Sequence, residues 1–122
     1  ILYEMTPEVA STLEISQEAF DAYSTGMRMA VTDSVLGTAT YFKDYDIAVA
    51  AKTGTAQHGS GGSDNAAFVC YAPYEDPEIA VAVYVEKGAQ GGYLASVAEA
   101  VFDYYFSQSQ TTELLPGELD ME

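Results

Sequence analysis

The chain has 122 residues, of which 48% are hydrophobic and 19% are charged. This length and composition fit one globular domain with a modest core and exclude a disordered chain. Its 19 acidic residues outnumber 4 lysines and arginines, which gives a formal net charge of −15 and argues against binding to nucleic acid or to an anionic membrane surface.

Several further classes are disfavoured by what the sequence contains. No apolar run approaches the roughly 20 residues of a membrane-spanning helix, and no export signal is recognisable. The first residue is Ile1 rather than methionine, so we expect the chain to be a piece of a longer protein. Cys70 is the single cysteine and is interpreted as a buried, unreactive side chain. His58 alone is not a set of metal ligands, and we expect neither a metal nor a cofactor.

The first predicted element is a helix over Gln17–Thr32. Ser16 is a good N-cap residue, and Glu18 stands in the first turn. Apolar residues then recur at helical spacing: Phe20, Tyr23, Met27, Ala30 and Val31. Such a stripe is typical of a helix that packs against a core.

Three strands are predicted next, over Ile47–Thr53, Ala66–Ala72 and Ile79–Val85. A connection rich in glycine and serine separates the first two, and two prolines mark the turn between the second and third. We expect the three strands to pair in succession as an antiparallel sheet.

A final helix is predicted from Gly91, because an apolar stripe follows at helical spacing and would cover the sheet: Leu94, Val97, Ala98, Val101, Phe102 and Tyr105. Residues 1–106 thus form the predicted domain, and residues 107–122 a flexible acidic tail. The order helix, three strands, helix predicts an α+β fold. Two helices are little cover for a sheet that is apolar on both faces, so we expect part of the domain to lie outside this chain.

The motif Lys52-Thr53-Gly54-Thr55 stands at the end of the first predicted strand. An ammonium and two hydroxyls suit an anion such as a carboxylate, because hydrogen bonds to a charged group are stronger than neutral ones. Gly54 would let a ligand approach the backbone closely. The motif therefore predicts an anionic ligand beside the strand. For the triplet alone, a solvated lysine and a turn glycine are the ordinary alternative.

Six stretches carry a more specific signal: ISQEAFDAYSTGMRMAVTD from Ile15, GTA from Gly37, VAAKTGTAQ from Val49, DNAAFVCYAP from Asp64, PEIAVAVYVEKG from Pro77 and GGYLAS from Gly91. In this order they resemble the transpeptidase domain of high-molecular-mass class B penicillin-binding proteins over nearly all of residues 6–106. K-T-G is a signature of this family and of the related β-lactamases. The resemblance implies the C-terminal portion of a penicillin-binding, β-lactamase-like fold.

The resemblance also implies a reaction, the cross-linking of peptidoglycan through a serine acyl-enzyme that β-lactams form as well. Lys52 would supply cleft charge and help proton transfer, while Thr53 and Thr55 would bind the substrate carboxylate. The backbone N–H of Thr55 would be an oxyanion donor, and Gly54 would keep the wall clear. The implied partners are stem peptides ending in D-Ala-D-Ala and β-lactams, at the extracytoplasmic face of the bacterial cytoplasmic membrane.

Two motifs of that family are missing. No serine in this chain has a lysine three residues later, so the S-x-x-K nucleophile and base are absent. The family's S-x-N motif precedes K-T-G, whereas Ser63-Asp64-Asn65 follows it and is predicted to be loop. We therefore expect the chain to be the C-terminal part of the domain, to be inactive alone, and to have the upstream half of the domain as its partner.

Two alternatives stay open, a serine β-lactamase and a non-catalytic homologue that senses penicillin or serves as structure. The upstream sequence would separate them from a transpeptidase. Because an outer strand would be left without its neighbour, we expect the isolated chain to self-associate through that edge or to fold poorly.

Overall fold

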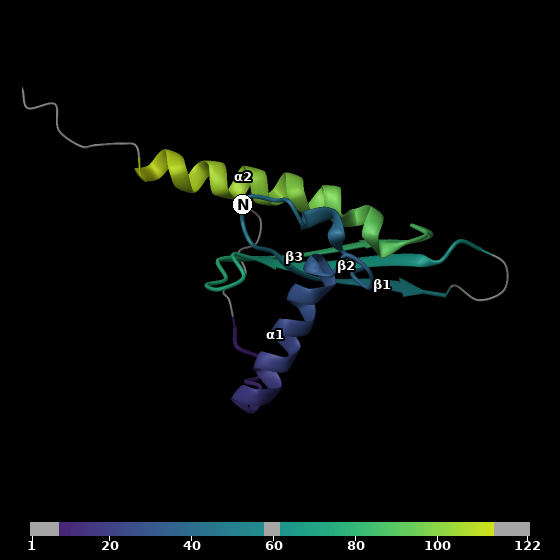
Figure 1. Ribbon diagram of the computed structural model, residues 1–122, viewed down its shortest axis with the longest axis horizontal. Helices are drawn as coiled ribbons and strands as arrows, with labels where there is room; N and C mark the ends of the chain where they lie inside the picture. Colours follow the sequence, from purple (N-terminus) through teal and green to yellow (C-terminus); the bar gives the residue numbers. More distant parts are fainter. Residues whose placement is uncertain (1–7, 58–61, 114–122) are drawn as a thin grey trace, which may run out of the picture.

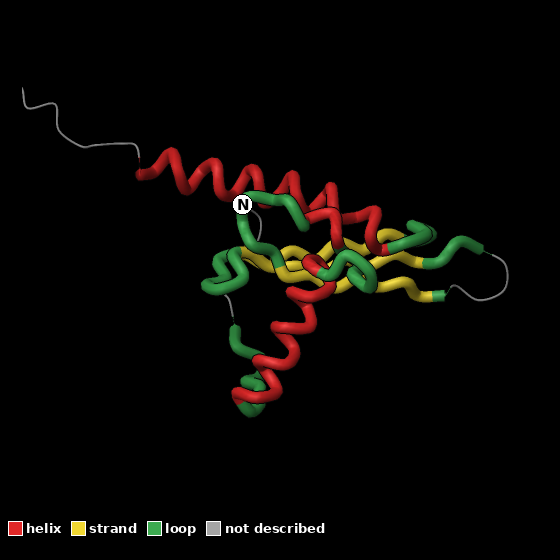
Figure 2. Tube along the Cα trace, viewed as in Figure 1, coloured by secondary structure: helices red, strands yellow, loops and turns green. Residues whose placement is uncertain are grey.

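A three-stranded antiparallel sheet lies between two helices in the computed structural model, which describes residues 8–57 and 62–113 (Figure 1). The elements are α1 (Gln17–Thr32), the 3-10 helix η1 (Thr40–Phe42), β1 (Ala50–Ala56), β2 (Asn65–Ala72), β3 (Ile79–Val85), the 3-10 helix η2 (Gly91–Leu94) and α2 (Ala95–Glu113). Helix α2 runs along one face of the sheet, and α1 crosses the other face steeply (Figures 1 and 2). The predicted α+β class and the strand order β1-β2-β3 are confirmed.

Helix α1 has the predicted bounds, because its first turn is capped as the sequence indicates. The Ser16 side chain accepts a hydrogen bond from the Ala19 N–H at 3.2 Å. Met27 and Val31 are buried, whereas Phe20 and other apolar residues of the first turns are exposed. Figure 1 shows why: the first half of the helix extends away from the sheet. Only the second half of α1 therefore packs on the strands.

Strand β1 begins three residues later than predicted and continues to Ala56. Before it, the carbonyl of Ala48 accepts a hydrogen bond from the Tyr74 N–H at 2.8 Å, so this part of the chain pairs with the β2–β3 turn region instead of the sheet ladder. Within the ladder, Lys52 pairs with Val69. The K-T-G motif consequently lies inside the strand rather than at its end.

The core is centred on three phenylalanines from three elements. Phe42 of η1 lies 6.1 Å from Phe68 of β2 and 5.8 Å from Phe102 of α2, measured between ring centroids. All three rings are buried. Cys70 is buried as predicted, and this burial raises the pKa of its thiol to about 12. Two members of the predicted α2 stripe, Val97 and Val101, are exposed, because the narrow sheet covers only part of the helix.

Helix α2 extends further than the sequence predicted. Residues 107–113 are helical, so the predicted tail begins too early; residues from 114 onward lie outside the described part. The Ser107 hydroxyl donates to the Tyr104 carbonyl at 2.8 Å, and neither glycine nor proline occurs between Ala95 and Pro116. Among the described helices, none is long and apolar enough to cross a membrane.

Two tyrosine–carboxylate hydrogen bonds tie the segment around η1 to α2. Tyr41 donates to Glu99 at 2.6 Å, and Tyr45 donates to Asp103 at 2.7 Å. Burial, followed by the hydrogen bond to Asp103, raises the pKa of Tyr45 far above its ordinary value. These bonds hold in place the segment that leads from α1 into β1.

Candidate functional site

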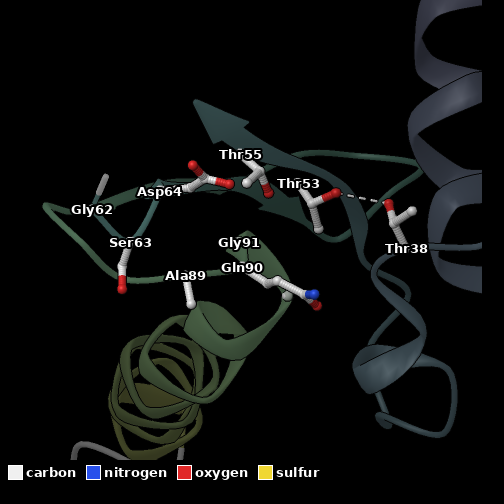
Figure 3. A pocket seen from close by; sticks show the side chains of 10 residues that line it. Thr38, Thr53, Thr55, Gly62, Ser63, Asp64, Ala89, Gln90 and Gly91 are labelled. Atoms are coloured by element: carbon white, nitrogen blue, oxygen red, sulfur yellow. Dashed lines mark hydrogen bonds between the residues drawn. The ribbon is translucent and has the colours of Figure 1, made fainter. Parts of the chain in front are cut away.

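A cavity of about 570 Å³ opens beside β1, between this strand and the turn that leads into η2 (Figure 3). Its lining comes from the loop after α1, from β1, from the residues just before β2, and from the turn into η2 with the first residues of η2: Thr38, Thr53, Thr55, Gly62, Ser63, Asp64, Ala89, Gln90, Gly91 and Gly92. Segments far apart in sequence thus meet around two residues of the predicted motif.

Thr53 and Thr55 contribute two hydroxyl groups to this cavity. Residues two apart in a strand point to the same face of a sheet, and Figure 3 shows both side chains directed toward the same space. The Thr53 hydroxyl also donates to the hydroxyl of Thr38, with 2.8 Å between the oxygens. The two threonines that the resemblance assigns to carboxylate binding therefore line the same cavity.

Lys52 is placed differently from the two threonines. By strand alternation it belongs to the other face, and it lines an adjoining cavity of about 400 Å³ next to α1. Its ammonium donates to the Thr53 carbonyl at 2.5 Å. The two cavities share Thr38 and Thr53 in their linings. The four-residue site predicted from sequence is thus divided between two faces of one strand.

Two glycines, Gly54 of β1 and Gly91 of η2, allow close contacts between backbone segments at this point. A Cβ on Gly54 would lie 3.2 Å from the Ala67 Cβ, which is tight but open to small adjustment. A Cβ on Gly91 would lie only 2.3 Å from the Ala67 carbonyl oxygen and 2.7 Å from that of Gly54. Gly91 therefore lets the start of η2 rest directly on the backbone of β1 and β2.

On the far side of the cavity, hydrogen bonds join the residues around the start of β2 to the turn after β3. The Asn65 side chain accepts a hydrogen bond from the Lys87 N–H at 3.0 Å, and the Ala89 N–H donates to the Asp64 carbonyl at 3.0 Å. Lys87 and Ala89 have φ of 56° and 64°, a region that costs non-glycine residues energy and recurs beside functional sites. Ser63 and Asp64 lie before β2, as predicted, and both line the cavity. The loop prediction is wrong for Asn65, which pairs with Ala56 as the first residue of β2.

Hydroxyls beside an outer strand suit recognition of an anion or of an extended peptide. The described residues contain no cluster of three or more histidine, cysteine or acidic side chains that could hold a metal. His58 lies outside the described residues.

A family model described as the penicillin binding protein transpeptidase domain matches residues 2–106. The chain belongs to this transpeptidase family. One relative is the peptidoglycan D,D-transpeptidase MrdA of Acinetobacter baumannii, 34% identical over 106 residues that cover 75% of this chain and 16% of the relative. The resemblance drawn from the six sequence stretches is confirmed.

Solved transpeptidase structures share the fold. Penicillin-binding protein PBP2 of Pseudomonas aeruginosa, in complex with WCK 5153, superimposes with a TM-score of 0.69 at 33% identity, over 84% of this chain and 22% of that one. Penicillin-binding protein A of M. tuberculosis, an imipenem acyl-enzyme complex, gives a TM-score of 0.53 at 28% identity, over 72% and 20%. The chain thus spans a fifth or so of its relatives, as one part of a transpeptidase domain.

The sequence alone indicates no role for two residues beside this cavity. Thr38 lies within the GTA stretch, and nothing in its spacing indicates a contact with Thr53, 15 residues later. Gly91 stands in a Gly-Gly pair ahead of a helix, which signals a turn but not the contact with Gly54. Both contacts depend on the tertiary fold.

Proposed function

We propose that this chain is the C-terminal part of a peptidoglycan D,D-transpeptidase domain and forms the K-T-G wall of its active site. The observation that carries the proposal is the pair of hydroxyls, Thr53 and Thr55, on one face of an outer strand beside a cavity of about 570 Å³. The family membership and the relatives named as D,D-transpeptidases support it.

In this proposal the reaction is an acyl transfer. A serine upstream of this chain attacks the D-Ala-D-Ala carbonyl of a stem peptide, the terminal D-Ala leaves, and the acyl group passes to an amine on a neighbouring strand. β-Lactams acylate the same serine, and a structural neighbour that is an imipenem acyl-enzyme complex supports this class of ligand. Cross-linking of this kind places the protein at the extracytoplasmic face of the bacterial cytoplasmic membrane.

The two threonines bind the carboxylate of the acyl donor. Their hydroxyls lie on the same strand face, so they can each donate a hydrogen bond to one carboxylate group. A hydrogen bond to a charged partner contributes about 1.5–3 kcal/mol, compared with about 1 kcal/mol for a neutral pair. Two such bonds are enough to select a ligand that carries a free carboxylate.

Lys52 and the Thr55 backbone have complementary roles. The Lys52 ammonium donates to the Thr53 carbonyl, which supports an orientation of this carbonyl toward the open edge of the sheet. Backbone groups two residues apart point the same way, so the Thr55 N–H also faces that edge and serves as an oxyanion donor. From the neighbouring cavity, Lys52 supplies positive charge and assists proton transfer through a serine of the upstream half, while Gly54 keeps the strand clear of side chains.

The test is intact-mass spectrometry after incubation with benzylpenicillin. It compares this chain with the extended protein, meaning the chain joined to the upstream part of its transpeptidase domain. We expect one adduct on the extended protein and none on the chain alone, because the nucleophile motif S-x-x-K is absent here.

Each other outcome has a definite meaning. No adduct on the extended protein would favour a non-catalytic homologue and overturn the proposal. Rapid hydrolysis of the adduct, with turnover of penicillin, would favour a serine β-lactamase instead. An adduct on the short chain would mean that the nucleophile is one of the residues of this chain.

A further inference from the structure

Thr38 touches the proposed carboxylate-binding residue without belonging to the K-T-G motif. It precedes η1 and lines both cavities beside β1. Figure 3 shows its side chain facing Thr53, and the two hydroxyl oxygens are 2.8 Å apart. It is therefore the point where the loop after α1 meets the strand.

The backbone on both sides of Thr38 is held in place. The Ala39 N–H donates to the Ala30 carbonyl at 2.9 Å, and Ala39 itself is buried. The Gly37 N–H donates to the Asp33 carbonyl at 3.1 Å, and a Cβ on Gly37 would come within 2.3 Å of that oxygen. Because both neighbours are held by hydrogen bonds, the backbone of Thr38 has a defined position, from which its hydroxyl reaches Thr53.

Asp33 adds a second anchor to the same loop. Its carboxylate accepts hydrogen bonds from the N–H groups of Val35 at 2.8 Å and Leu36 at 2.9 Å. These two bonds, Leu36 first, lower the pKa of Asp33. The turn therefore keeps its shape throughout the neutral pH range.

The hydroxyls of Thr38 and Thr53 can each donate one hydrogen bond. In the structure Thr53 donates to Thr38, which leaves the Thr38 proton unused within the pair. When a carboxylate accepts the Thr53 proton, the Thr38 hydroxyl can rotate and donate to the Thr53 oxygen. Hydrogen bonds in such a chain polarise one another, so the bond from Thr53 to the carboxylate is strengthened and oriented.

We infer that Thr38 is a positioning residue that orients the Thr53 hydroxyl toward the carboxylate of the acyl donor. The inference rests on the proposed function, because it concerns the same ligand group. It assigns Thr38 an effect through Thr53 and not a contact with the ligand. The loss of one neutral hydrogen bond corresponds to about a fivefold change in an equilibrium or rate constant.

The experiment measures the second-order rate constant of acylation of the extended protein by benzylpenicillin and by its methyl ester, which lacks the negative charge. Thr38→Val removes the hydroxyl and keeps the shape, whereas Thr38→Ser keeps the hydroxyl. Thr40→Val is a matched control, because Thr40 is an exposed threonine of η1 outside both cavity linings. We expect Thr38→Val to slow acylation by the free acid about fivefold, and Thr38→Ser and Thr40→Val to leave it nearly unchanged.

Two further comparisons separate positioning from structure. Thr38→Val should leave the rate with the methyl ester nearly unchanged, and it should add no further loss to a Thr53→Val variant. An equal loss with acid and ester, additive losses in the double variant, or no loss with the acid would overturn the inference. A failure of the unsubstituted extended protein to react with benzylpenicillin would overturn the proposed function, and this inference with it.

Discussion

At the scale of single residues, two adjacent glycines of η2 meet different surroundings. Gly91 lies against the backbone of β1 and β2, where a Cβ would approach the Ala67 carbonyl oxygen to 2.3 Å. A Cβ on Gly92 would find only the Thr38 carbonyl oxygen, at an ordinary 3.4 Å. The close contact sets the distance between the turn and the motif strand, so the width of the cavity depends on Gly91.

We predict that Gly91→Ala lowers the thermal unfolding midpoint of the extended protein clearly, since overpacking against backbone costs about 1–3 kcal/mol. The matched variant Gly92→Ala should change the midpoint little. Differential scanning calorimetry of the two variants provides the comparison. Equal midpoints for the two variants would show that the turn can move away from the strands at little cost.

At the scale of elements, the pair of tyrosine–carboxylate bonds joins the segment around η1 to α2, next to the phenylalanine core. Both bonds join a residue before β1 to one 58 positions later in α2. They fix the segment that carries Thr38 relative to the helix that covers the sheet. The arrangement of the site therefore depends on contacts between α2 and η1 as well as on the strand itself.

Tyr45→Phe should lower the free energy of unfolding by about 1 kcal/mol at neutral pH. This loss is small for a hydrogen bond to a charged group, because water partly reaches the bond between Tyr45 and Asp103. The pKa of Tyr45 is raised in the folded state, so its stabilisation is complete below the ordinary phenol pKa of about 10 and is lost as pH rises above it. Thermal melts at pH 8 and above pH 10 should show the unsubstituted protein losing more stability than Tyr45→Phe. Tyr104→Phe, at an exposed position of α2, is the control. If Tyr45→Phe and the unsubstituted protein lost the same stability between pH 8 and the higher pH, this account of the Tyr45 hydrogen bond would be contradicted.

The bounds of a helix or strand can be predicted from the sequence where neighbouring residues mark its ends. The Ser16 cap and the 3.6-residue period give the bounds of α1, whereas the apolar run from Ile47 continues smoothly into β1, so nothing local marks where pairing starts. The threonine pair followed from the K-T-G motif. The contacts of Thr38 and Gly91 join separate elements and could not be predicted from spacing.

At the scale of the whole molecule, the described structure leaves β3 as an outer strand and exposes apolar side chains on α1 and the sheet, including Phe20, Tyr23, Met29, Val69 and Tyr84. Exposed apolar side chains next to an outer strand are typical of an interface. In the proposed function, the upstream half of the domain covers it. The net charge of −15 opposes contacts between copies of the chain.

The isolated chain should therefore self-associate as concentration rises, and more strongly at 0.5 M salt than at low salt, because salt screens the repulsion. Sedimentation velocity over a range of concentrations measures this directly. A single monomeric species under all conditions, with cooperative unfolding, would contradict the expected need for the upstream half.

The most direct test of the central claim is a crystal structure of the extended protein acylated by benzylpenicillin. We predict that the carboxylate of the bound penicillin lies within hydrogen-bond distance, about 3 Å, of the hydroxyl oxygens of both Thr53 and Thr55. A carboxylate directed away from β1, with the two threonine hydroxyls bonded only to protein or water, would contradict the assignment of this strand as the carboxylate-binding wall.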